Sequence, residues 1–417
     1  MPGHDIVIIG AGQAGFSTAS FLRKQGFEGS IKLVGGERFP PYQRPPLSKR
    51  YLLGKVTAER LLLRKEQFYL DSAIEYEWGC TVDSVDMETG QIETSSGVLS
   101  FNNVVLATGS SPVNLPASIG GDLPGVHSIR SIVDIDTIRK NLPSIKELVI
   151  VGGGYIGLEA AAVFRQLDVN VTIVEAADRI LKRVASPECA RYFHQLHESK
   201  GVSFREGTKV KHIHSTAHSK NANAMTVELD DGTELSADAV IVGIGATPDT
   251  ELAKNAGLNC DKTSDGILVN AFSQTSHPNA WAAGDCAAFR FGESIIRLES
   301  VQNATDQAAN IAQNIIGLAN GQETAYTPVP WFWSDQFDVK LQIAGLNTGY
   351  STVIERADPK TGSPSYWYFK DKELLAVDAI NDAAAFMTAR KLLEQQTTID
   401  PDTLQNPNLD IKTLLQV

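Results

Sequence analysis

Two stretches of the chain share one pattern of apolar and polar positions. Each begins with a short apolar run, passes through a glycine-rich turn into a helix-like segment and ends with a second apolar run. In the first stretch the runs lie at residues 5–9 and 31–34, with a helix expected up to about Gln25. In the second they lie at residues 148–151 and 171–174. Short apolar runs of this kind are typical of strands buried on both faces, so each stretch predicts strand, turn, helix and strand.

Both turns contain the spacing G-x-G-x-x-G. The glycines that fill it are Gly10, Gly12 and Gly15 in the first turn and Gly152, Gly154 and Gly157 in the second. The first glycine allows a tight turn, the second lets a pyrophosphate approach the backbone, and the third lets the helix pack on the strand. The helix N-terminus adds free N–H groups and partial positive charge. Two dinucleotide sites are therefore predicted.

Glu175 ends the second strand of the second stretch. A carboxylate at this point can accept a hydrogen bond from a ribose 2′-hydroxyl and would repel a 2′-phosphate. The second site is therefore predicted to prefer NAD over NADP.

Further patterns predict elements between and after these stretches. They are a strand ending in a small-residue turn at 101–109, a helix at 134–143, alternating strands within 201–242 and, within 240–248, a strand that ends in glycines. Residues 281–285 are expected to form a strand with Asp285 at its carboxyl tip, where an acid could bond a flavin's ribityl hydroxyl. Ser300 is the expected N-cap of a helix whose N-terminus could stabilise negative charge on a reduced flavin.

The pattern changes at about residue 322. Apolar segments at 339–343, 365–369 and 374–377 and a helix near 383–395 predict a third, α+β domain. Trp331 and Trp333 are either ordinary core or interface aromatics or residues that cover a flavin or lie on an electron exit route.

A proline-rich loop and a buried acid supply candidate chemistry. Four prolines within residues 39–49 predict an extended, rigid loop, which is either a connector or a rim that holds Lys49 beside a cofactor. Glu159 follows Gly157 by two residues and is expected in the first turn of an apolar helix. It is either a favourable partner of the helix dipole or a partly buried acid that needs a partner, with Lys49 and a nicotinamide carboxamide as candidates.

The histidines do not predict a metal site. His212, His214 and His218 lie close together, but no cysteine or acid cluster accompanies them, so a solvated strand and loop is expected. His194 and His197, three apart on an expected helix, are interpreted in the same way.

Composition restricts the class of protein. The 417 residues predict two or three domains, and the net charge of −12 argues against nucleic acid and anionic membrane as partners. The four cysteines form no close pair, which fits a reducing compartment without disulfides or a zinc site. A strand entered by Ile6 leaves no room for a signal peptide, and no apolar run is long enough for a membrane span. A soluble, cytoplasmic protein is expected.

Seven motifs together carry a family resemblance. They are GAGQAG at 10–15, RPPLSK at 44–49, LATG at 106–109, GGGYIGLE at 152–159, AAGDCA at 282–287, ESVQNA at 299–304 and PWFWSDQ at 330–336. Over essentially all of its length, the chain resembles the FAD- and NADH-dependent ferredoxin reductases of bacterial oxygenase systems, within the glutathione-reductase-like flavoprotein superfamily. RPPLSK and WFWSDQ are more diagnostic than the glycine loops.

The resemblance implies an α/β fold with two Rossmann-like dinucleotide-binding domains and a C-terminal α+β domain. The FAD-binding domain is expected to be discontinuous, at 1–112 and 245–321. The NAD-binding domain is expected at 113–244 and the C-terminal domain at 322–417.

The resemblance also implies site residues. Those expected to bind FAD are Gly10, Gly12, Ala14, Gly15, Glu37, Arg44, Lys49, Val82, Ala107, Thr108, Gly109, Arg130, Gly284, Asp285, Ser300, Val301 and Trp331. Those expected to bind NAD are Gly152, Gly154, Tyr155, Ile156, Gly157, Glu159, Glu175 and Gly245. Lys49 and Glu159 are the expected catalytic pair. Gly36 stands where the family commonly has Asp, so Glu37 alone is expected at the first adenosine ribose.

The implied function is a ferredoxin–NAD+ reductase (EC 1.18.1.-). Electrons would pass from NADH through FAD, one at a time, to a 2Fe–2S ferredoxin that serves a haem monooxygenase or a ring-hydroxylating dioxygenase. The complex would be transient, and the protein a monomer or weak homodimer. The superfamily's thiol chemistry is not expected, because residues 45–49 contain no cysteine. An NADH oxidase, or an NADH-switched redox sensor resembling apoptosis-inducing-factor-like flavoproteins, remain alternatives.

Overall fold

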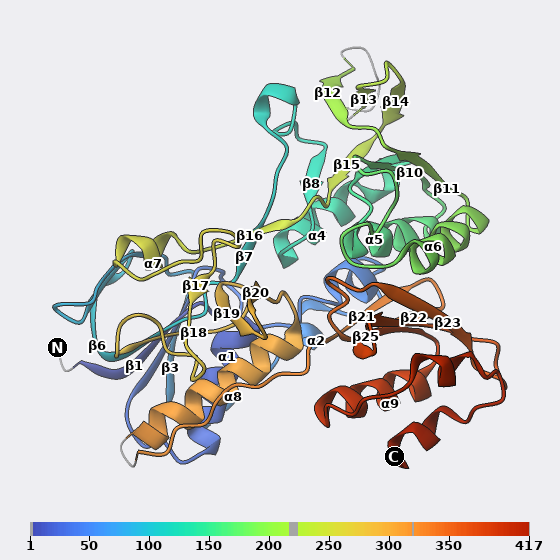
Figure 1. Cartoon of the computed structure of the whole chain (residues 1–417). Helices are drawn as coiled ribbons and strands as arrows, with labels where there is room; N and C mark the ends of the chain where they lie inside the picture. The colour runs from blue at the N-terminus through green and yellow to red at the C-terminus, as the bar shows by residue number, and fades with distance from the viewer. Residues whose placement is uncertain (1–2, 217–223, 319–320, 417) are drawn as a thin grey trace. The chain divides into compact units, whose positions relative to one another are not determined.

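The computed structural model describes residues 3–216, 224–318 and 321–416 (Figure 1). The chain divides into two compact units. Unit 1 comprises Met1–Gln43, Ala58–Ser111 and Ala246–Pro328, and unit 2 comprises Arg44–Thr57, Pro112–Gly245 and Val329–Val417. Unit 2 thus contains both the second glycine loop and the C-terminal region, while the three expected domain boundaries stay a prediction.

A sheet with a parallel centre forms the body of unit 1. Its strands run in the order β3-β2-β1-β6-β5-β4, with β18 paired to β6. The bounds are β1 His4–Ile9, β2 Ile31–Gly35, β3 Ile74–Trp78, β4 Val82–Asp86, β5 Gln91–Thr94, β6 Gly97–Leu106 and β18 Ala280–Ala282. The strands β1, β2, β3, β6 and β18 are parallel, and β4 and β5 add an antiparallel edge. Both strands predicted around the first glycine loop are confirmed.

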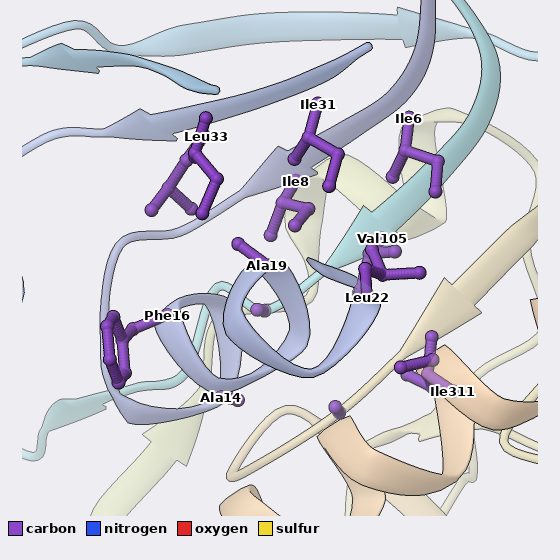
Figure 2. Packing of buried hydrophobic residues seen from close by; sticks show 14 of the residues in the cluster. Ile6, Ile8, Ala14, Phe16, Ala19, Leu22, Ile31, Leu33, Val105 and Ile311 are labelled. Carbon is purple, nitrogen blue, oxygen red and sulfur yellow. The ribbon is translucent and has the colours of Figure 1, made fainter. Parts of the chain in front are cut away.

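The alternation of side chains along β1 explains why its apolar run is unbroken. Ile6 and Ile8 belong to one buried cluster, and Val7 and Ile9 belong to another on the opposite face. The first cluster packs beneath helix α1 (Gln13–Lys24) and includes Ile311 of α8 (Val301–Leu318), as Figure 2 shows. The glycine turn between β1 and α1 is therefore held between two buried elements.

Unit 2 contains a second parallel sheet with the order β11-β10-β9-β15-β8. The bounds are β8 Val126–Ser128, β9 Glu147–Val151, β10 Asn170–Glu175, β11 Val202–Glu206 and β15 Ala239–Val242. Its helices are α4 Ile132–Asn141, α5 Tyr155–Gln166 and α6 Pro187–Ser199. A small antiparallel sheet is formed by β12 Val210–Ser215, β13 Met225–Leu229 and β14 Glu234–Ala237. The strands predicted around the second glycine loop are confirmed.

The C-terminal part of unit 2 is an antiparallel sheet covered by one long helix (Figure 1). Its order is β21-β22-β25-β24-β23, and the bounds are β21 Trp331–Gln336, β22 Val339–Gly345, β23 Thr352–Ala357, β24 Pro364–Lys370 and β25 Glu373–Ile380. Helix α9 (Ala383–Glu394) packs on β22 and β25 through Phe386 and Leu392. The predicted α+β character is confirmed, and β21 and β23 were not predicted.

The remaining helices and strands are short. They are α2 Ala58–Leu61, α3 Glu66–Asp71, α7 Glu251–Asn255, β7 Ser110–Pro112, β16 Ala246–Pro248, β17 Ile267–Leu268, β19 Ala287–Phe291 and β20 Ser294–Arg297.

Three local predictions need correction. The proline-rich segment is not extended throughout, because residues Leu47–Tyr51 form a short helix that is kinked at Lys49. Proline's fixed φ also suits the start of a helix, and Pro46 has helical φ and ψ there. Helix α4 begins two residues before the predicted start, because Ser131 caps it. Strand β18 ends at Ala282, and Gly284 has a φ of +83°, so Asp285 lies in a turn beyond the strand.

A carboxyl group is buried in the C-terminal sheet. Asp378 on β25 is fully buried, and the Tyr368 hydroxyl donates to its Oδ2 at 2.5 Å. Its Oδ1 has no hydrogen-bond partner among the described residues. Burial raises the pKa of Asp378 to about 7.

This burial predicts an unusual dependence of stability on pH. The Asp378 carboxyl stays protonated in the folded protein up to about pH 7, whereas in the unfolded chain it ionises near its ordinary pKa of about 3.9. Wild type should therefore lose unfolding free energy as pH rises from about 4 to about 7, with no further loss above that. In Asp378→Asn this contribution is absent. Urea unfolding of both proteins across this range measures the difference, and the exposed turn variant Asp371→Asn is the control. Equal pH slopes for wild type and Asp378→Asn would contradict the assignment.

Candidate functional site

The first glycine loop is shaped by two close backbone approaches. Gly10 has a φ of +107°, and a Cβ at Gly10 would lie 2.1 Å from the Ala107 carbonyl oxygen. A Cβ at Gly15 would lie 1.9 Å from the Gly10 carbonyl oxygen. By contrast, a Cβ at Gly12, the N-cap of α1, would meet no described atom within 4 Å. The first turn of α1 contains no acid that would repel an anion. Its free N–H groups adjoin the open space beside Gly12, and together they fit a pyrophosphate.

The second glycine loop repeats this geometry. Gly152 has a φ of +109°, and a Cβ there would lie 2.4 Å from the Gly243 carbonyl oxygen. A Cβ at Gly157 would lie 2.2 Å from the Gly152 carbonyl oxygen, whereas one at Gly154, the N-cap of α5, would meet no described atom within 4 Å. In both loops the first and third glycines lie against backbone and the second faces open space, which fits two dinucleotides.

An acid lies at the end of the second strand in each unit. Glu175 ends β10, and its two carboxylate oxygens each accept a backbone N–H, from Gly153 and from Ala177, both at 2.7 Å. Each oxygen keeps capacity for a further hydrogen bond. Glu37 follows β2 and accepts the Tyr42 hydroxyl at 2.5 Å. A Cβ at the neighbouring Gly36 would meet no described atom within 4 Å, so the fold leaves room for a side chain there.

Several predicted flavin residues of unit 1 gather around the first loop. The Gly10–Ala107 approach brings residues 107–109 to the loop, and a Cβ at Gly284 would lie 3.0 Å from the Ala14 Cβ. The Ser110 hydroxyl donates to Asp285 Oδ2 at 2.8 Å, which ties the turn after β18 to the start of β7. Thr108 Oγ1 donates to the Asp249 carbonyl at 2.6 Å.

The other predicted flavin residues are placed less directly. Ser300 caps α8 by accepting the Asn303 N–H at 3.1 Å, so Val301 is the first residue of that helix. Val82 begins β4 and packs on a buried cluster that includes Cys80 and Val34.

Four predicted flavin residues belong to unit 2. Arg44 donates to the Arg130 carbonyl at 2.7 Å. The ring of Trp331 lies 6.0 Å from that of Phe386, and the Arg390 guanidinium lies 5.7 Å from the Trp331 ring centre. These contacts favour a core role for Trp331. The role of Arg44, Lys49, Arg130 and Trp331 toward a flavin stays a prediction.

The kinked helix at 47–51 brings Lys49 to Glu159. Lys49 Nζ lies 2.5 Å from Glu159 Oε2, and the Ser48 hydroxyl donates to the same oxygen at 3.1 Å. The other oxygen, Oε1, accepts the Ser334 hydroxyl at 2.9 Å. Glu159 is 6% exposed, so the expected buried acid with Lys49 as its partner is confirmed. Because α5 begins at Tyr155, Glu159 lies in the second turn rather than the first, where the helix dipole has weakened.

Of the other residues predicted to bind NAD, Tyr155 and Ile156 are the first two of α5. The ring of Tyr155 packs 5.2 Å from Phe332, whereas Ile156 is 51% exposed. Gly245 has a φ of +129°, and a Cβ there would lie 3.8 Å from the Arg183 guanidinium.

The interpretation of His197 was wrong. His197 is fully buried rather than solvated, its Nε2 lies 2.9 Å from Gln336 Oε1, and burial lowers its pKa to about 4. Cys189, Phe193 and His197 are buried at intervals of four residues along α6, a helical spacing that could have predicted this burial. The involvement of Ser334 and Gln336 was also missed.

The described residues contain neither a cluster of metal ligands nor a disulfide nor a membrane-spanning helix. No group of three or more His, Cys, Asp or Glu side chains within 3–216, 224–318 and 321–416 could hold a metal ion. The rings of His212 and His214 stack at 4.1 Å, and His218 lies outside the described residues. All four cysteines are free thiols, and three of them are buried. None of the described helices is long and apolar enough to cross a bilayer.

Two family models and a full-length relative match nearly the whole chain. The family model described as pyridine nucleotide-disulphide oxidoreductase matches residues 4–308, and one described as reductase C-terminal matches 331–415. A ferredoxin–NAD(P)+ reductase of Sphingomonas sp. is 40% identical, and the match covers 99% of this chain and 98% of the relative.

Two solved structures are similar to the whole chain. The covalent complex of putidaredoxin reductase with putidaredoxin matches with a TM-score of 0.92 and 36% identity, covering 100% of this chain and 99% of the matched chain. The ferredoxin reductase for the CYP199A2 system of Rhodopseudomonas palustris matches with a TM-score of 0.90 and 37% identity, covering 98% and 99%.

The glycine geometry predicts that two substitutions in one loop have different effects. Gly154→Ala places a methyl group in open space, so thermal unfolding should be unchanged while NADH binding weakens at least about 10-fold. Gly157→Ala forces the helix away from Gly152 and should cost about 1–3 kcal/mol of unfolding free energy. Thermal unfolding and NADH titration of both variants separate the two effects. Equal loss of stability in both would contradict the open space at Gly154, and unchanged NADH binding in Gly154→Ala would show that this position is not a ligand site.

Proposed function

The chain belongs to the pyridine nucleotide-disulphide oxidoreductase family, and we propose that it passes electrons from NADH through FAD, one at a time, to a 2Fe–2S ferredoxin. It is an oxidoreductase of the ferredoxin reductase type, with FAD and a nicotinamide dinucleotide as its cofactors. The proposed ferredoxin serves a haem monooxygenase or a ring-hydroxylating dioxygenase, since one protein of similar structure is the ferredoxin reductase for the CYP199A2 system.

The observation that carries this proposal is the repeated loop geometry. Each unit has a helix with an open glycine N-cap and a carboxylate after the neighbouring strand, which suits two dinucleotides rather than one. Unit 1 is proposed to bind the FAD pyrophosphate at Gly12 and the adenosine ribose at Glu37. Unit 2 is proposed to bind NADH, with the ribose 2′-hydroxyl on Glu175.

Bound FAD supplies the chemistry, since a flavin accepts a hydride and can release electrons singly. The protein contributes position and charge. Lys49 neutralises the buried Glu159, and the carboxylate so held is proposed to orient the nicotinamide carboxamide. The N-terminus of α8 after Ser300 is proposed to stabilise negative charge near the flavin ring.

The proposed partner binds transiently. Successive single-electron deliveries require the ferredoxin to dissociate, so a small, polar and salt-sensitive interface is expected. A putidaredoxin reductase has been captured with its putidaredoxin, which supports a small iron–sulfur partner for the chain. A monomer or weak homodimer in the cytoplasm suits this role.

Transient kinetics test the function. Mixed anaerobically with NADH, the holoenzyme should bleach its flavin and then reduce a 2Fe–2S ferredoxin of an oxygenase system faster than it reduces dioxygen. Raised ionic strength should slow the ferredoxin step and leave flavin bleaching unchanged. Fast dioxygen reduction with no ferredoxin reduction would identify an NADH oxidase instead. Slow bleaching with a long-lived charge-transfer band would identify a redox sensor.

Cofactor preference tests the role of Glu175. The double variant Glu175→Ala/Ala176→Arg removes the carboxylate and adds a cation beside it. The ratio of kcat/KM for NADH to kcat/KM for NADPH should fall by roughly 10- to 100-fold, because a charge-assisted hydrogen bond is lost. The matched control is Glu206→Ala, which removes a strand-end carboxylate that also accepts a backbone N–H, from Ile180 at 2.8 Å. An unchanged ratio in the double variant would refute the role of Glu175.

A further inference from the structure

A row of buried hydrogen bonds runs from Glu159 into the C-terminal sheet. Ser334 Oγ lies 2.9 Å from Glu159 Oε1, Gln336 Nε2 lies 3.1 Å from Ser334 Oγ, and His197 Nε2 lies 2.9 Å from Gln336 Oε1. Ser334, Gln336 and His197 are each 0% exposed. All four residues belong to unit 2 and come from α5, β21 and α6.

The donors in this row all point toward Glu159. Burial lowers the pKa of His197 to about 4, so its ring is neutral near pH 7. Since the amide oxygen of Gln336 can only accept, His197 Nε2 carries the proton and donates to it. Gln336 Nε2 then donates to Ser334, and Ser334 donates to the carboxylate. The opposite amide orientation would place two acceptor oxygens on the one Ser334 proton, which leaves one of them unsatisfied.

The row assigns different tasks to the two carboxylate oxygens. Each oxygen of an ionised carboxylate can accept about two hydrogen bonds. Oε2 is filled by Lys49 and Ser48, whereas Oε1 accepts from Ser334 and keeps one further position. Oε1 is therefore the oxygen available to a ligand N–H, and Ser334 is the side chain that fixes where this oxygen points.

We infer that Ser334 is a positioning residue for hydride transfer from NADH, acting through Glu159 Oε1. Gln336 and His197 orient the Ser334 hydroxyl, and that hydroxyl holds Oε1 toward the nicotinamide carboxamide N–H. The inference rests on the proposed role of Glu159 and adds the residues that set its geometry. Because the reaction needs its atoms aligned to within a fraction of an ångström, a misdirected Oε1 should slow the transfer more than it weakens binding.

The primary test is anaerobic stopped-flow reduction of the holoenzyme by NADH. Ser334→Ala should lower the limiting rate of flavin bleaching by about 10-fold, with a smaller rise in the apparent Kd for NADH. Ser334→Thr keeps the hydroxyl and should restore most of the rate. The control is Ser365→Ala, another fully buried serine in the same sheet, whose hydroxyl bonds the Arg356 carbonyl and Trp367 instead.

A modified dinucleotide separates positioning from general structural damage. In reduced 3-acetylpyridine adenine dinucleotide a methyl ketone replaces the carboxamide, so the N–H that Oε1 would accept is missing. Ser334→Ala and wild type should therefore reduce at similar rates with this analogue. If Ser334→Ala slows both reductants equally, or leaves both unchanged, the inference is wrong. If Ser334→Thr fails to fold, Gln336→Met, which removes the donor to Ser334, should give a smaller loss that is also confined to NADH.

Glu159→Leu, which removes the acceptor oxygens, distinguishes failure of this inference from failure of the proposed function. If Glu159→Leu leaves the preference for NADH over the analogue unchanged, the proposed role of Glu159 fails and the inference fails with it. If Glu159→Leu abolishes that preference while Ser334→Ala retains it, the role of Glu159 stands and only the role of Ser334 is refuted.

Discussion

A buried carboxylate needs compensation, and in unit 2 that requirement brings together distant parts of the chain. Glu159 is held by Lys49 and Ser48 from the proline-rich segment and by Ser334 from the C-terminal sheet, which lies 175 residues away in sequence. Removing one partner of such a group leaves an unbalanced charge or an unsatisfied oxygen in a medium that solvates it poorly. The fold around α5 therefore depends on the chain satisfying both oxygens at once.

Strand β21, which carries Ser334, packs against different elements on its two faces. Side chains of β21 alternate, so Phe332, Ser334 and Gln336 share one face and Trp331 and Trp333 the other. The first face contacts Tyr155, Glu159 and His197, which lie on α5 and α6, whereas Trp331 packs on α9. Three positions of the WFWSDQ motif are thus explained, because Ser334 and Gln336 lead to a buried acid and Trp331 meets an apolar core.

What could be predicted from the sequence is what local geometry determines. Both glycine loops, their strands and the strand-end acid Glu175 follow from spacing, because a turn that brings a backbone oxygen within about 2 Å of a would-be Cβ admits only glycine. The pairing of Lys49 with Glu159 was a candidate because a buried acid needs a cation. Ser334, Gln336 and His197 were missed because their bonds span 139 to 175 residues or connect positions that look ordinary in isolation.

The errors have the same physical origin. Four prolines predict an extended segment at 39–49, yet the fixed φ of proline suits a helix start equally well, and the tertiary partner of Lys49 selects the kinked helix. The polarity of histidine predicts a solvated His197, although its place on the buried face of α6 and the amide of Gln336 keep it neutral inside the protein. A polar residue in a sequence indicates a surface only when no partner is folded against it. Here the partners of the buried polar residues form one connected row, which ends at the acid proposed to orient the nicotinamide.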